Sequence, residues 1–90
     1  MCKKYILLVD EKESILVSIS WALEKNNFIA TAAADGQKAI EELRAREYGL
    51  VITDLFMPRV DGIGVLTQAK RLYPNIGVII LTRYPLYQTE

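Results

Sequence analysis

Four short apolar runs divide this chain at nearly regular intervals, and they constrain the fold more than any other feature. The first run is Tyr5-Ile6-Leu7-Leu8-Val9, which contains no alternating polar residue and stops at Asp10. The others are Phe28-Ile29-Ala30, Leu50-Val51-Ile52 and Val78-Ile79-Ile80-Leu81. An unalternating run is typical of a strand buried on both faces, as in a parallel sheet. Because about twenty residues with helical periodicity separate successive runs, the pattern predicts strand–helix–strand units and an α/β fold.

The first intervening stretch predicts a helix over about residues 13–26. Its apolar face would consist of residues at helical spacing: Ile15, Leu16, Ile19, Ala22 and Leu23. Val17 and Trp21 are four residues apart and lie off that face, so they could form an exposed interface patch. A partly buried tryptophan is an equally common alternative.

Two more helices are expected in the other stretches. One follows Asp35-Gly36, where Asp35 fits the N-cap position. Its core face would consist of Ala39, Ile40 and Leu43. The other lies between Gly62 and Tyr73, with Ile63, Leu66 and either Ala69 or Lys70 turned inward. Three helices cover a four-stranded sheet thinly, so we expect the ordered unit to be larger than these 90 residues.

Composition excludes several classes of protein. Apolar residues make up 51% of the chain and charged residues 24%, as in one small globular domain. The 11 basic and 11 acidic residues cancel, which argues against nucleic-acid contact and against charge-driven membrane binding. No apolar run approaches the ~20 residues of a membrane span or resembles a signal peptide. With Cys2 as the single cysteine and no histidine, we expect a cytoplasmic domain without disulfides or imidazole chemistry.

Acidic and hydroxyl residues follow three of the four predicted strands. Asp10 and Glu11 follow the first strand, Asp54 the third and Thr82 the fourth. Because the carboxyl ends of parallel strands meet at one edge of a sheet, we expect a cluster of three carboxylates there. Such carboxylates repel one another unless a cation neutralises them, and an all-oxygen site suits Mg²⁺. A carboxylate such as Asp54 can attack phosphorus, and the Thr82 hydroxyl could donate to a phosphoryl oxygen.

Four motifs, in order and at family spacing, resemble the receiver domain of two-component response regulators. They are Leu7-Leu8-Val9-Asp10-Glu11, Ala34-Asp35-Gly36 with Ala39, Val51-Ile52-Thr53-Asp54-Leu55-Phe56-Met57-Pro58 with Asp61-Gly62, and Val78-Ile79-Ile80-Leu81-Thr82. The resemblance implies a flavodoxin-like, doubly wound parallel sheet with strand order 2-1-3-4. It covers about the first three quarters of a typical receiver. We therefore expect one receiver domain over residues 1–90, truncated after the fourth strand, with the fifth strand and last helices absent.

The same resemblance implies a phosphoacceptor function. Asp54 would take a phosphoryl group from the phosphohistidine of a histidine kinase, and the chain would be no enzyme beyond this self-catalysed transfer. Asp10, Glu11 and Asp54 would hold Mg²⁺ together with the backbone carbonyl of Phe56. Glu11 stands where the family more often has aspartate, and its longer side chain should still reach the metal.

The resemblance assigns switching to the end of the fourth strand. Thr82 would be the switch hydroxyl that moves toward the phosphoryl group, and Tyr84 a second switch position or simply a packed surface residue. Arg83 stands where the family prefers a small residue. The family's fifth-strand lysine has no counterpart, because no lysine follows Lys70.

Two further functions compete with phosphorylation. Without the fifth-strand lysine, the chain could be a binding-only module that forms a homodimer or exchanges elements between copies through an exposed strand edge. A phosphatase with an aspartyl phosphate would need an acid two residues after Asp54, where Phe56 stands. A C-terminal output domain is a common partner in the family, and nothing in these 90 residues represents one.

Overall fold

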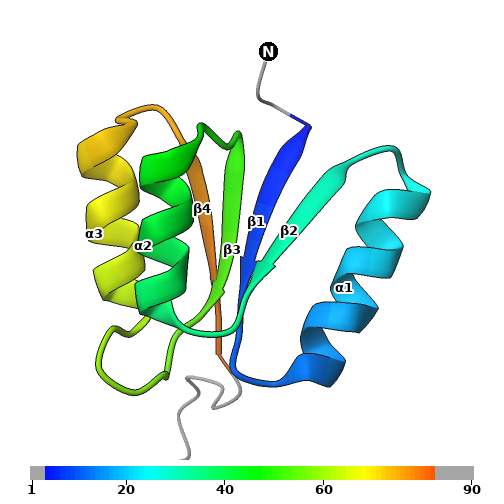
Figure 1. Ribbon diagram of the computed structural model, residues 1–90, viewed down its shortest axis with the longest axis horizontal. Coiled ribbons are helices and arrows are strands. Elements are labelled where there is room, and N and C mark those ends of the chain that lie inside the picture. Colours follow the sequence, from blue (N-terminus) through cyan, green and yellow to red (C-terminus); the bar gives the residue numbers. More distant parts are fainter. Residues whose placement is uncertain (1–3, 83–90) are drawn as a thin grey trace, which may run out of the picture.

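The apolar runs form a four-stranded parallel sheet in the computed structural model, which describes residues 4–82 (Figure 1). In chain order the elements are β1 (Tyr5–Val9), α1 (Glu13–Lys25), β2 (Ile29–Ala33), α2 (Gly36–Ala45), β3 (Leu50–Asp54), α3 (Gly62–Leu72) and β4 (Gly77–Leu81). The strands lie in the order β2-β1-β3-β4, and every neighbouring pair is parallel. Helices α2 and α3 cover one face and α1 lies on the other, which confirms the predicted doubly wound α/β fold.

The hydrophobic core lies between the sheet and helices α2 and α3. Alternate strand residues point to this face, so Leu7, Val9 and Val51 are buried together. They meet small and branched residues from the two helices, Ala39, Leu43, Val65 and Ala69. The predicted core face of α2 is confirmed, and the side chain of Asp35 caps the helix by accepting a hydrogen bond from Lys38 N at 2.8 Å.

Two sequence predictions about these elements were wrong in detail. The second strand was expected over 28–30, but β2 starts at Ile29 and continues to Ala33. Its alanines give little apolar signal, and register with β1 decides its length instead. In α3, the predicted inward Ala69 is fully buried and Leu66 is partly buried, but Ile63 is 49% exposed. Val65, which was not predicted, is fully buried instead. The Asp61 side chain caps α3 by accepting from Gly64 N, which marks the helix start, and Val65 and Ala69, four residues apart, pack into the core.

Helix α1 is packed much more lightly than the other two helices. None of its 13 residues is buried, and Ala22, expected on the core face, is exposed. Over β4 on the same face of the sheet, Ile79 is 46% exposed and Leu81 39% exposed. The expected thin coverage of one sheet face therefore holds for residues 4–82. In this same part of the chain, no helix combines the length and the apolar character needed to cross a membrane.

Tyr48 is a buried polar anchor that sequence reasoning did not single out. It precedes β3, is only 2% exposed, and its hydroxyl donates to Glu42 Oε1 at 2.7 Å. Burial raises the pKa of the Tyr48 phenol above its usual value, the Glu42 carboxylate adds to this, and the Thr31 hydroxyl partly offsets it. The neutral phenol is therefore the form that the folded chain favours.

This pKa shift predicts a loss of stability at alkaline pH. Because the folded-state pKa lies above the unfolded value of about 10, the stabilising contribution is complete below pH ~10 and falls as pH rises through the folded pKa. Tyr48→Phe should lose about 0.5–1.5 kcal/mol at pH 8, because the hydrogen bond to Glu42 disappears. Between pH 8 and 11, the free energy of unfolding should fall less for Tyr48→Phe than for the parent chain.

Urea unfolding followed by circular dichroism at both pH values measures these differences. Tyr5→Phe, which also removes one phenol, serves as the control and should keep the parent's alkaline loss. An equal alkaline loss in the parent and in Tyr48→Phe would contradict the assignment.

Candidate functional site

Asp10 and Asp54 lie side by side at the carboxyl ends of the two central strands. Val9 of β1 pairs in register with Thr53 of β3, so the next residue along each strand is an aspartate. The Asp10 side chain is 6% exposed and that of Asp54 is 2% exposed. Two carboxylates this deeply buried at adjacent strand ends form the acidic site that the sequence predicted at this edge of the sheet.

The turn into α1 holds Asp10 in place. Its backbone N–H donates to Ala33 O at 3.2 Å, and its Oδ1 accepts from Lys12 N at 2.8 Å. Lys12 is the N-cap residue of α1 and provides no side-chain cap, so the Asp10 carboxylate satisfies the Lys12 N–H at the helix entry. Asp10 therefore has a structural role as well as its candidate site role.

Backbone contacts from both sides hold Asp54. Asp54 pairs in register with Leu81 of β4, and Leu55 N donates to Leu81 O at 2.8 Å. At the start of α3, Gly62 N donates to Leu55 O at 2.8 Å. Thr82 immediately follows Leu81, so the chain brings the predicted switch residue to the same sheet edge as Asp54. Thr82 is exposed, while Arg83 and Tyr84 lie outside the described residues.

Two glycines have a role that the sequence did not reveal. Gly62 does not have a positive φ, so no left-handed backbone conformation requires a glycine there. A Cβ at Gly62 would lie 2.5 Å from Asp54 O and 2.9 Å from Leu55 Cα. A Cβ at Gly36 would lie 2.4 Å from Val60 O. Both glycines are thus needed for close backbone approach, and Gly62 supports the backbone of the candidate phosphoacceptor directly.

Two neighbouring residues in the loop from Asp54 to α3 differ in burial. Phe56 is 54% exposed, whereas Met57 is 8% exposed and belongs to the core cluster. Arg59 adopts a positive φ of 68°, which is uncommon for a residue with a side chain. Burial of Met57 fixes the loop against the core, and Phe56 lies in this loop two residues after Asp54.

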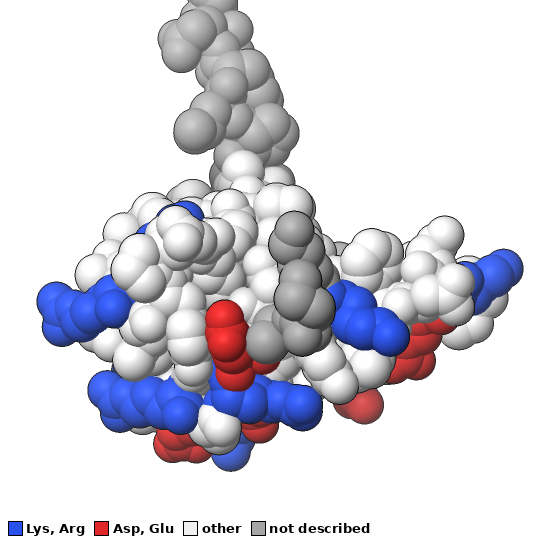
Figure 2. All heavy atoms as spheres, turned by 90° about the horizontal axis from the view of Figure 1, so that it is seen from above, with Lys and Arg blue, Asp and Glu red and all other residues white. Residues whose placement is uncertain are grey.

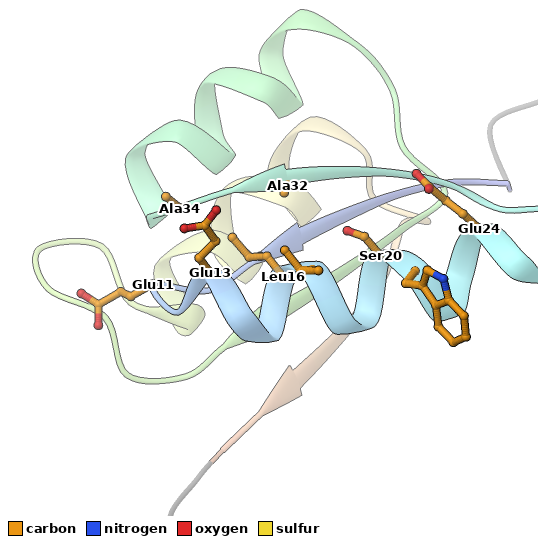
Figure 3. Close-up of a pocket in the computed structure, with 9 residues that line it drawn as sticks. Glu11, Glu13, Leu16, Ser20, Glu24, Ala32 and Ala34 are labelled. Atoms are coloured by element: carbon orange, nitrogen blue, oxygen red, sulfur yellow. The ribbon is translucent and has the colours of Figure 1, made fainter.

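Glu11 does not join the acidic pair in this structure. Its side chain is exposed, and Figure 3 shows it extending outward from the loop that follows β1. Within residues 4–82, no group of three or more Asp, Glu, Cys or His side chains could hold a metal ion. The expected cluster of three carboxylates is therefore reduced to Asp10 and Asp54. Glu11 lies beyond the end of the strand, where water hydrates its charge, and strand geometry does not constrain it.

The predicted interface residues of α1 are exposed. Val17 is 61% exposed and Trp21 is 64% exposed. The Lys25 ammonium lies 4.6 Å from the centroid of the Trp21 ring, a cation–π geometry. The structure thus favours an exposed tryptophan over a partly buried one, and the contact role of these residues stays a prediction.

Charge is distributed unequally between the two ends of the sheet. The helices carry basic residues in their last turns, where they complement the helix dipoles: Lys25, Arg44, Lys70 and Arg71. Figure 2 views this end, where the strands begin, and shows Lys and Arg side chains around its rim with Asp and Glu between them. The buried aspartates Asp10 and Asp54 lie at the opposite end, where the strands finish.

Comparison with known families decides which class of protein carries this site. Residues 6–88 match the model of the response regulator receiver domain. The chain belongs to the receiver domain family. It is 32% identical over 84 residues to sporulation initiation phosphotransferase F of Bacillus subtilis, covering 93% of this chain and 68% of that protein. It is 33% identical over 79 residues to the alkaline phosphatase synthesis transcriptional regulatory protein PhoP of Bacillus subtilis, covering 88% of this chain but only 33% of PhoP.

Solved receiver structures have the same fold. The signal receiver domain of an HD domain-containing protein from Pseudomonas fluorescens superposes with a TM-score of 0.84 at 34% identity, covering 90% of this chain and 65% of that one. The response regulator TrrA from Thermotoga maritima, in complex with Mg(2+)-BeF, gives a TM-score of 0.84 at 27% identity, covering 93% and 71%. The receiver described here therefore spans about two thirds of these solved chains.

Proposed function

We propose that this receiver is a phosphoacceptor module that takes a phosphoryl group onto Asp54 from the phosphohistidine of a histidine kinase. The observation that carries the proposal is the buried pair Asp10–Asp54 at adjacent carboxyl ends of β1 and β3. Family membership supports it, since receivers are signalling modules rather than ordinary enzymes. The single cysteine favours the reducing cytoplasm as its compartment.

The transfer requires a nucleophile that is held rigidly. An Asp54 carboxylate oxygen attacks phosphorus, the phosphorus–nitrogen bond of the donor breaks, and the released imidazole takes up a proton. The hydrogen bonds of Leu55 to β4 and to Gly62 fix the Asp54 backbone. Asp54 therefore loses little conformational freedom at the moment of transfer. The product is an acyl phosphate on Asp54, which lies at the same edge of the sheet as Thr82.

The oxygen donors around Asp54 fit a magnesium ion. Carboxylates of Asp10 and Asp54 and the backbone carbonyl of Phe56 are the ligand types that Mg²⁺ takes, and Glu11 could turn inward from its exposed position. When bound, the ion would neutralise charge on the transferring phosphoryl oxygens. The TrrA receiver structure contains Mg(2+)-BeF, which supports magnesium use by analogy.

Glu11→Ala should weaken Mg²⁺ binding by roughly tenfold, because the site loses one carboxylate donor. Isothermal titration calorimetry with MgCl₂ measures the change. Glu13→Ala, which removes a neighbouring exposed carboxylate, is the control and should bind like the parent. An unchanged titration in Glu11→Ala would remove Glu11 from the metal site.

Switching would follow through Thr82. Its hydroxyl would move to donate to a phosphoryl oxygen on Asp54, and the end of β4 would move with it. Tyr84 is the proposed second switch position. The relative PhoP is a transcriptional regulatory protein of which this chain matches only a part, so the readout would be altered contact with a partner or an attached output domain.

The exposed apolar edge favours a second candidate function. Ile79 and Leu81 of β4, at one edge of the described sheet, are substantially exposed. The 90-residue chain could act by self-association or element exchange there, without phosphorylation. Light scattering across a concentration series would detect this. A particle size that grows with concentration in the parent chain but not in Ile79→Lys supports self-association. A constant monomer mass excludes it.

A further inference from the structure

Thr53 is a polar residue in the hydrophobic interior, one position before Asp54. Its exposed fraction is 0%, and it pairs in register with Val9 of β1. Val9 belongs to the core cluster, and paired residues of parallel strands point to the same face of a sheet, so Thr53 also points into this core. A buried hydroxyl without a hydrogen bond costs free energy, whereas valine would fill nearly the same volume without that cost. The Thr53 hydroxyl therefore needs a hydrogen-bond partner.

The partner of this hydroxyl is the backbone carbonyl of the proposed phosphoacceptor. Thr53 Oγ1 donates to Asp54 O at 3.0 Å. The same oxygen lies close to the first residue of α3, because a Cβ at Gly62 would be only 2.5 Å from it. The Asp54 carbonyl is therefore confined both by a side chain of its own strand and by the start of the following helix.

The peptide group that links Asp54 to Leu55 is held at both of its polar atoms. Its oxygen accepts from Thr53 Oγ1, and its N–H, which belongs to Leu55, donates to Leu81 O of β4 at 2.8 Å. Since a peptide group is planar, these two hydrogen bonds together fix its orientation. The orientation of this peptide group sets the ψ angle of Asp54, and with it the direction in which the Asp54 side chain leaves the end of β3.

We propose that Thr53 is a positioning residue for phosphoryl transfer, an inference that rests on the function proposed above for Asp54. The Thr53 hydroxyl restrains the Asp54 peptide group, so the carboxylate is held in the direction from which it attacks phosphorus. Thr53 acts through the backbone of Asp54 and forms no bond with the phosphoryl group. Its γ-methyl group has a separate role, because it only fills volume in the core.

A purely structural role for Thr53 is the competing explanation. Threonine is β-branched and favours strands, and a buried hydrogen bond contributes to stability wherever it occurs. Under this explanation, folded protein would transfer the phosphoryl group equally fast with or without the hydroxyl. The two explanations therefore differ in whether the transfer rate follows the hydroxyl or follows the stability of the fold.

Thr53→Val removes the hydroxyl and keeps the volume of the side chain. With acetyl phosphate and Mg²⁺, we expect its maximal labelling rate, measured by intact mass spectrometry, to fall about tenfold, because Asp54 is less well oriented. The Mg²⁺ concentration that gives the half-maximal rate should stay as in the parent.

Thr53→Ser makes the opposite change, because it keeps the hydroxyl and loses the methyl group. It should unfold at a lower urea concentration than the parent but be labelled at the parent's rate. Thr53→Ala lacks both groups and should be labelled as slowly as Thr53→Val. Because the serine and alanine variants differ only in the hydroxyl, this pair decides the question if Thr53→Val does not fold.

Thr67→Val is the matched control. Thr67 Oγ1 also donates to a backbone carbonyl, that of Ile63 at 2.9 Å, but on the exposed surface of α3, so this variant should be labelled like the parent. Equal maximal rates with and without the Thr53 hydroxyl, or rates that follow the urea midpoint across the variants, would overturn the positioning role. A shift confined to the half-saturating Mg²⁺ concentration would also overturn it, because the hydroxyl would then act on the metal site. A folded parent that takes no label would overturn the phosphoacceptor function itself, and this inference with it.

Discussion

Asp54→Asn should abolish the phosphoryl adduct that the parent chain forms with acetyl phosphate and Mg²⁺. The amide keeps the shape of the carboxylate but lacks its charge and its nucleophilic oxygen. Because Asp54 is 2% exposed beside Asp10, replacing it with a neutral side chain also removes repulsion between two buried carboxylates, so the variant should remain folded. Intact mass spectrometry of parent and variant after the same incubation measures the result.

Asp61→Asn is the matched control for this experiment. Asp61 belongs to the same β3–α3 segment and caps α3 by accepting from Gly64 N at 2.9 Å, a role that asparagine also fills. The control should therefore be labelled like the parent. An adduct retained in Asp54→Asn would refute the phosphoacceptor assignment. A folded parent that takes no label would instead favour the self-association candidate.

Gly62→Ala should destabilise the receiver by about 1–3 kcal/mol, because the new methyl group would overlap backbone atoms. The added Cβ would lie 2.5 Å from Asp54 O and 2.9 Å from Leu55 Cα, and neither atom can rotate away as a side chain could. Relief of the clash has to move β3 relative to α3, which also displaces the Asp54 side chain. Labelling by acetyl phosphate should then be slower by roughly tenfold or more.

Gly64→Ala tests whether the effect comes from this contact or from any methyl group added to α3. Its Cβ would lie 3.0 Å from Val60 Cγ1 and 3.6 Å from Asp61 Oδ1, both of them side-chain atoms that can adjust. Alanine also favours the helix over glycine, so this variant should stay within about 1 kcal/mol of the parent. Urea unfolding of both variants measures the difference, and equal losses would contradict the proposed role of Gly62.

The fold could be predicted from the sequence because its main signals are local. The unbroken apolar run that forms β1 indicates a strand buried on both faces without reference to any other residue. The Asp35 cap and the Ala39–Leu43 stripe likewise follow from neighbours within one helix. The strand β2 was misplaced for the opposite reason, because its alanines become a strand only through pairing with β1.

Prediction of the site depended on how each residue is held. Asp10 directly follows β1 and Asp54 is the last residue of β3, so the register between the two strands brings them together as expected. Glu11 lies two residues beyond β1, and no strand geometry directs its side chain toward the pair. The close approach of Gly62 to the Asp54 backbone had no sequence signal, since a glycine in a turn and a glycine against a neighbouring strand look alike.

Three features could therefore be predicted from short segments of the chain: the parallel α/β architecture, the helix cap at Asp35, and the placement of Asp10 and Asp54 at one edge of the sheet. These depend on apolar periodicity and on strand ends, which are properties of short segments. The extent of β2, the core face of α3 and the outward position of Glu11 could be found only from the three-dimensional structure. Each of these depends on the packing of segments distant in sequence, where the size of a neighbouring side chain determines what is filled and what stays open.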